Sequence, residues 1–106
     1  MSIKIADAHT HIYPAKIADK ATAAIGDFYD ISMDKIGTSK ELIENGNVIG
    51  VDKYLVCSAA TTPKQVESIN NFLFEEGKEH PEFVVLGSMH KDYEDYKTEL
   101  KRMKDM

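Results

Sequence analysis

Apolar and polar residues alternate along this chain in short blocks, and the spacing of these blocks predicts strands separated by helices. Nearly continuous apolar runs predict three strands, over residues 3–9, 52–59 and 83–90. After the first strand, apolar residues recur at helical spacing, which predicts a helix from Ala15 to about Phe28.

The other helices are recognised by their ends. A Thr-Ser pair at residues 38–39 is expected to cap a short helix that frays at Asn-Gly-Asn, residues 45–47, a sequence equally compatible with a turn. A proline at a first helical position begins a longer helix over residues 63–80, and a His-Pro step ends it. A last amphipathic helix is expected over residues 93–103.

This order of elements predicts an α/β fold in a single domain spanning residues 1–106. Apolar strands alternating with amphipathic helices are typical of a parallel sheet covered by helices through right-handed crossovers. In such folds the chemistry gathers at the carboxyl ends of the strands. His9, His11, Ser58 and His90 are therefore expected at that edge of the sheet.

Composition and charge narrow the function classes. The chain is 42% hydrophobic and 29% charged, with a net charge of −5, so it has no basic excess with which to bind nucleic acid or an anionic membrane. The lone cysteine excludes an internal disulfide, and the start resembles no secretory signal. Apolar runs fall far short of the roughly 20 residues of a membrane span. A soluble cytoplasmic protein is expected.

The stretch Asp7-Ala8-His9-Thr10-His11 carries the clearest chemical signal. If strand alternation holds, Asp7, His9 and His11 share one face of the first strand. Two imidazoles on one face can converge on a divalent ion such as zinc, and Asp7 is a candidate for orienting a ligand from the second shell. A chance His-x-His pair without a metal is the competing interpretation.

This stretch, after an Ile-Lys-Ile strand and before Ile-Tyr-Pro, resembles the opening motif of the amidohydrolase superfamily. The similarity is to its amidohydrolase-related branch, which includes the aminocarboxymuconate-semialdehyde decarboxylase-like enzymes. The stretches over residues 50–56 and 83–90 resemble the second and third strands of that branch.

The resemblance implies a (β/α)₈ TIM barrel, of which this chain holds the first three βα units. It implies one divalent metal, zinc in most members, with His9 and His11 matching the first two ligands. Such enzymes activate water to hydrolyse C–N or C–O bonds of small molecules, or decarboxylate small carboxylic acids without oxidation. The other ligands and the acid/base residue of the family lie on later strands, so the catalytic residues are expected beyond Met106.

Two ligands are fewer than the three that a catalytic zinc needs, so the 106 residues alone are expected to be inactive. Three parallel strands also leave two open edges, which proteins usually cover or close. The chain is therefore expected either to associate with itself through these edges or to form part of a larger barrel. We favour the second alternative.

Other residues are weaker candidates. Tyr13, in the loop after the motif, and His90, at the end of the third strand, are possible substrate contacts. Cys57 is interpreted as a small hydrophobe on an apolar strand, and His80 as a solvated helix end. Glu75 and neighbouring acidic residues are interpreted as surface charges.

Two rival functions stay open at this point. A metal-dependent phosphoesterase or TatD-type nuclease also begins with His-x-His on its first strand, although the lack of a basic surface disfavours a nuclease. The rival from a different class is a non-catalytic α/β module that self-associates through its sheet edges.

Overall fold

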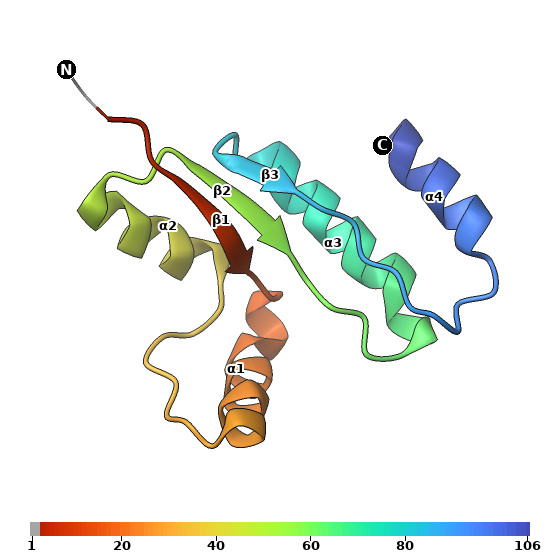
Figure 1. Cartoon of the computed structure of the whole chain (residues 1–106), viewed down its shortest axis with the longest axis horizontal. Helices are drawn as coiled ribbons and strands as arrows, with labels where there is room; N and C mark the ends of the chain where they lie inside the picture. The colour runs from red at the N-terminus through yellow and green to blue at the C-terminus, as the bar shows by residue number, and fades with distance from the viewer. Residues whose placement is uncertain (1–2) are drawn as a thin grey trace.

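The computed structural model describes residues 3–106, which form a three-stranded parallel sheet in the order β1-β2-β3 with helices between the strands (Figure 1). This arrangement confirms the expected α/β class with parallel strands and covering helices. The elements in chain order are β1 (Ala6–His11), α1 (Ala15–Tyr29), α2 (Ser39–Ile49), β2 (Lys53–Cys57), the 3₁₀ helix η1 (Pro63–Gln65), α3 (Val66–Glu79), β3 (Phe83–Val85) and α4 (Tyr96–Asp105).

The strand and helix limits differ from the sequence prediction at β1, which spans Ala6–His11 and not residues 3–9, and around β3. This strand has three residues, because the chain beyond Leu86 leaves the sheet and Ser88 donates its N–H to the side chain of Asn70. The following loop turns on His90, whose carbonyl and ring nitrogen accept the N–H groups of Tyr93 and Asp92. The last helix therefore begins later than its apolar spacing suggests.

Helix α2 is continuous through Gly46, where the sequence suggested fraying or a turn. A Cβ atom at this position would overlap the hydroxyl of Tyr54, so glycine lets the helix approach β2 closely. The helix ends at Gly50, whose positive φ of 77° forms a left-handed cap. Tertiary packing thus overrides the local preference of the Asn-Gly-Asn sequence.

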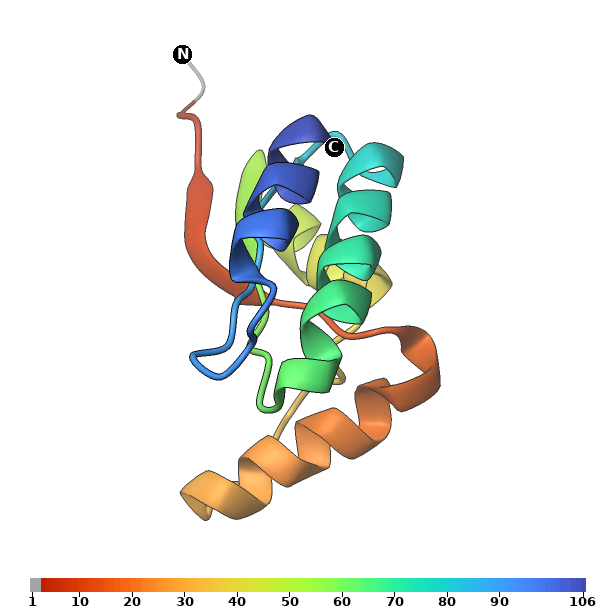
Figure 2. The same ribbon diagram turned by 90° about the vertical axis from the view of Figure 1, so that its right-hand side faces the viewer.

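One face of the sheet carries the hydrophobic core. Figure 2 shows α3 and α4 side by side along one flank of the sheet. Beneath the helices, side chains of this face pack with those of α3 and of the loop after β1. The buried members of this cluster are Ile12, Tyr54, Val56, Leu73 and Phe83.

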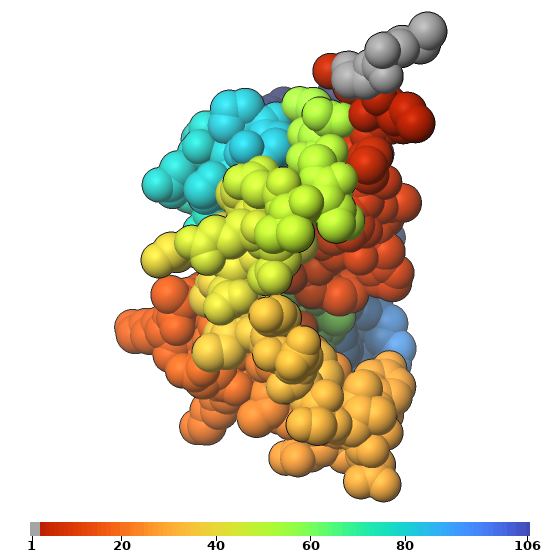
Figure 3. Space-filling view, turned by 90° about the vertical axis from the view of Figure 1, so that its left-hand side faces the viewer, coloured from red at the N-terminus to blue at the C-terminus, as the bar shows by residue number. Residues whose placement is uncertain are grey.

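The other face of the sheet has no helix over it among residues 3–106, and it carries exposed apolar side chains. Val84 is 50% exposed and Leu86 45%. Most of β1 is exposed as well, and Figure 3 shows its red atoms along one edge of the molecule. We call Leu55, Val84 and Leu86 the open apolar face.

Helix α1 projects away from the sheet (Figure 1). Its apolar residues are largely exposed, including Ile17 and Phe28, so much of the amphipathic stripe that predicted the helix faces no partner in the described residues. None of the described helices combines the length and the apolar character needed to cross a membrane.

Candidate metal centre

The histidine pair lies where β1 departs from regular pairing. From Asp7 to Thr10, β1 advances three residues, while its partner β2 advances two, from Tyr54 to Val56. This bulge places one extra residue in β1 and interrupts the alternation of its side chains. Asp7 is in register with Tyr54, which is buried in the core. Because the bulge lies between Asp7 and Thr10, Asp7 and the histidines do not share one face of the strand, although simple alternation predicts that they do.

The two imidazoles face each other at the carboxyl end of β1. Nε2 of His9 lies 3.1 Å from Nε2 of His11, with the rings edge to face and 4.8 Å between their centroids. Both side chains are exposed to solvent. The structure therefore brings together the two residues that the sequence predicted as ligands.

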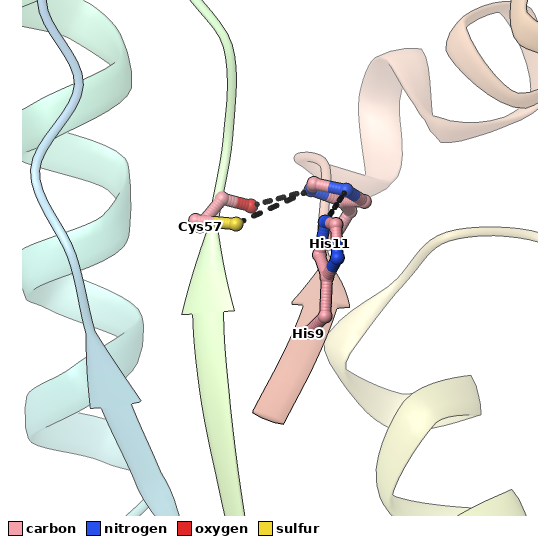
Figure 4. Close-up of side chains that lie close together, drawn as sticks. All are labelled: His9, His11 and Cys57. Carbon is pink, nitrogen blue, oxygen red and sulfur yellow. Dashed lines mark hydrogen bonds between the residues drawn. The ribbon is translucent and has the colours of Figure 1, made fainter. Parts of the chain in front are cut away.

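Strand β2 holds the ring of His11 in place. Nδ1 of His11 lies 3.0 Å from the carbonyl oxygen of Cys57 (Figure 4), and a carbonyl only accepts, so this nitrogen carries the proton. With the proton on Nδ1, Nε2 is the nitrogen of His11 that faces His9. Metal-ligating histidines usually have this arrangement, with the second nitrogen donating to a carbonyl or a carboxylate.

Asp7 contacts the motif through the backbone. Its carboxylate accepts the main-chain N–H of His9 at 3.2 Å. No hydrogen bond joins it to either imidazole among the described residues. Asp7 therefore supports the conformation of the strand, whereas the carbonyl of Cys57 orients an imidazole.

Tyr13 lines a groove of about 520 Å³ between α2 and the end of α3, together with Ser39, Glu76 and His80. Its N–H donates to the carbonyl of Gly37 at 2.7 Å. Burial raises the pKa of its phenol above the ordinary value of 10.0, and the nearby Cys57 adds to the effect. Tyr13 thus has a neutral phenol on a backbone held by Gly37.

His90 is half-buried and accepts the N–H of Asp92 through Nδ1 at 3.1 Å. It is not part of the group formed by His9 and His11. Its hydrogen bond shapes the loop that leads to α4.

Cys57 is the residue that sequence reasoning underrated. Its Sγ lies 3.7 Å from Nδ1 of His11 and 3.7 Å from the carbonyl oxygen of Thr10. Taken one per residue, the donor atoms of His9, His11 and Cys57 all lie within 4.8 Å of one another. Its position near the end of the strand expected over residues 52–59 was the available signal, because parallel strands bring their carboxyl ends together.

A second group, Glu76, Glu79 and His80 at the end of α3, has comparable spacing. Nε2 of His80 lies 3.2 Å from Glu76, and the same carboxylate oxygen accepts the hydroxyl of Ser39 at 3.0 Å. These contacts already join α3 to α2, so a structural role accounts for this group. His80 is therefore paired with a carboxylate, and its side chain is partly buried.

Sequence reasoning also missed a buried polar network between α3, α4 and the segment after β3. Asn70, fully buried, donates to the carbonyl of Ser88 at 3.0 Å and to Glu99 at 2.9 Å. Arg102 pairs with both oxygens of Glu99. The hydrogen bonds from Arg102 hold the pKa of Glu99 below its ordinary value although burial opposes the shift, and the bond from Asn70 adds to the lowering.

The imidazole pair fits a zinc-class ion. Bonds of about 2.0–2.1 Å in a tetrahedral zinc site put two nitrogens about 3.3 Å apart, close to the separation of the Nε2 atoms. Neutral imidazoles are ligands for zinc, copper, iron and nickel, whereas calcium and magnesium prefer oxygen. The donor chemistry thus agrees with the metal class expected from the sequence.

Comparison with known proteins adds no relative: no family model, no curated protein and no solved structure matches this chain.

Proposed function

We propose that this chain forms the first three βα units of a (β/α)₈ metal-dependent hydrolase of the amidohydrolase type. In this proposal His9 and His11 hold one zinc-class divalent ion at the mouth of the barrel. The observation that carries it is the 3.1 Å approach of their Nε2 atoms at the carboxyl edge of a parallel sheet. Active sites of such folds lie at that edge.

The open apolar face supports the barrel part of the proposal. Parallel sheets are normally covered on both faces, and the interior of a barrel is filled by branched apolar side chains. Val84 and Leu86 project from the face opposite the core, and the histidines lie at the carboxyl end of the strand beside β2. A packed lower layer with a polar mouth is the arrangement that a barrel enzyme requires.

The residues of this chain would hold and orient the catalytic ion. A bound zinc-class ion lowers the pKa of its water toward neutrality and polarises a substrate carbonyl, which suits hydrolysis of C–N or C–O bonds. His9 and His11 would supply two imidazole ligands. The carbonyl of Cys57 would keep His11 in the tautomer that binds through Nε2. Non-oxidative decarboxylation of a small carboxylic acid would use the same ligands.

The metal part is tested on the purified 106-residue chain, loaded with zinc, dialysed and analysed for metal by mass spectrometry. We expect zinc to remain with the wild-type chain and to be lost from the double variant His9→Ala/His11→Ala. The matched control is His90→Ala, which removes a histidine that the sequence placed at a strand end and the structure places in the loop before α4, outside the group. Unchanged zinc content in the double variant would remove both ligand assignments.

The barrel part is tested on the gene. We expect the reading frame to continue after Met106 with further βα units that contain strand-end histidines and a late aspartate. A stop codon directly after Met106 would contradict a single-chain barrel enzyme.

The open apolar face also favours a second candidate, a non-catalytic module that self-associates through its sheet. Val84 and Leu86 would then be covered by another copy of the chain. Sedimentation of the purified chain tests this alternative. A stable oligomer without hydrolytic activity, whose assembly is lost in Val84→Lys, would support the module over the enzyme.

A further inference from the structure

We infer that Cys57 supplies a third ligand to the proposed metal, so that β1 and β2 together form a two-histidine, one-thiolate site for a zinc-class ion. This inference rests on the proposed function and deepens it. The histidine motif alone offers two ligands. With Cys57 the described residues supply three, and the fourth position of a tetrahedral ion stays open.

The sheet register brings the thiol to the histidines. Cys57 is the last residue of β2 and pairs directly with His11 across the parallel ladder. Figure 4 shows its side chain at the end of β2, turned toward the ring of His11. The bulge in β1 sets this pairing, because a regular ladder continued from the Asp7–Tyr54 pair would place Thr10, the residue before His11, opposite Cys57.

The distances leave a small adjustment to a tetrahedral site. With bonds of about 2.3 Å to sulfur and 2.0–2.1 Å to nitrogen, a zinc ligand sphere has N···S edges of about 3.6 Å. Sγ of Cys57 lies 3.7 Å from Nδ1 of His11, the nitrogen that donates to the Cys57 carbonyl, so the thiol already contacts the ring whose Nε2 would bind the ion. With one donor atom taken from each residue, no pair in the group exceeds 4.8 Å, so the widest pair needs to close by about 1 to 1.5 Å. The two histidines are exposed, and exposed side chains change rotamer readily.

The thiolate narrows the metal class further. A soft sulfur ligand favours zinc and copper(I) and disfavours magnesium, calcium and manganese, which prefer oxygen. On binding, the thiol of Cys57 gives its proton to solvent and Sγ forms the bond to the ion. Three protein ligands with a free position for water or substrate are the arrangement of catalytic zinc sites.

Cobalt(II) titration of the purified chain tests the assignment, because thiolate-bound cobalt has a charge-transfer band in the near ultraviolet and histidine-bound cobalt lacks it. The titration is carried out without oxygen in the presence of excess magnesium. We expect the band in the wild-type chain and in the control His90→Ala. It should be absent in Cys57→Ser, with cobalt affinity at least about 100-fold weaker, since loss of even an outer-shell partner costs 10- to 100-fold.

Protection from alkylation gives a second readout that needs no variant. We expect zinc to slow the reaction of Cys57 with iodoacetamide at least about 10-fold, because a ligated thiolate is less available as a nucleophile. Magnesium at the same concentration should give no protection. Equal alkylation rates with and without zinc would overturn the inference.

The outcomes separate this inference from the proposed function. If the wild-type chain binds cobalt without the band and the His9→Ala/His11→Ala variant does not bind, Cys57 is not a ligand and the histidine site stands. If the wild-type chain binds no cobalt at all, both the inference and the metal part of the proposed function fail.

Discussion

Two polar clusters at the carboxyl side of the sheet are built in opposite ways. In the first, Asn70, Ser88 and Glu99 are buried, and their hydrogen bonds are satisfied within the protein. In the second, His9 and His11 are exposed, and their nitrogens face each other and a thiol. The first cluster suits a structural role, because its donors and acceptors already have partners. The second keeps ligand atoms available at the surface.

The largest expected effect comes from opening the buried cluster. Asn70→Ala removes three hydrogen bonds and leaves the N–H of Ser88 without its partner. We expect the free energy of unfolding to fall by about 3 kcal/mol, because a buried group that loses its partner bears its desolvation cost. Urea unfolding measures this loss. The control Asn71→Ala, which removes one exposed hydrogen bond, should cost less than about 1 kcal/mol. Equal losses in both variants would contradict a specific role for the network.

The exposed cluster of His9 and His11 should stabilise the fold when it binds zinc. At a zinc concentration 100 times the dissociation constant, the wild-type chain should gain about 2.7 kcal/mol, since binding to the native state adds to stability by mass action. Thermal unfolding with and without zinc measures the gain. His9→Ala/His11→Ala should show none, and an equal gain in that variant would point to a different zinc site.

A smaller effect is expected from acid, and it should come from the buried cluster. The pKa of Glu99 is lowered in the folded chain, chiefly by its hydrogen bonds with Arg102, so its contribution is complete above the ordinary carboxyl pKa of 4.5. This contribution disappears as the pH falls through the lower folded pKa. Unfolding free energies measured downward from pH 5 should therefore decline less steeply in Glu99→Gln than in the wild-type chain. Equal slopes of unfolding free energy against pH in the two proteins would show that the pKa of Glu99 is not lowered on folding.

The smallest effect should come from His11→Ala in metal-free buffer. The imidazole is exposed, so we expect the free energy of unfolding to change by no more than about 0.5 kcal/mol. Urea unfolding with a chelator present is the measurement. A loss comparable with that of Asn70→Ala would remove the contrast between the two clusters, because it would make His11 structural.

The sequence predicted those parts of the molecule that depend on local spacing. Apolar periodicity gave the order of strands and helices, and the His-x-His pair lies at the carboxyl end of β1 as expected. The family resemblance, the metal and the catalytic function stay predictions. The length of α2 was misjudged because Gly46 is held in the helix by packing against Tyr54, a contact between separate elements.

The parts that could not be predicted depend on how distant elements meet. The link between Cys57 and His11 follows from a bulge that shifts the register by one residue, and no local pattern in β1 marks it. Asn70 and Glu99 lie on amphipathic helices, where isolated polar residues look solvated until α3 and α4 are packed together. Both clusters are properties of the tertiary structure, although their residue types are visible in the sequence.

The pairing of β1 with β2 also has a consequence for the order of folding events. His9 and His11 are neighbours in any conformation of the chain, whereas His11 and Cys57 are separated by 46 positions and meet only when the crossover through α1 and α2 has closed. Closing so long a segment is slow compared with forming a helix. In a refolding experiment, imidazole contacts with a metal could therefore form early, while the approach of the thiol would mark the moment at which the parallel strands pair.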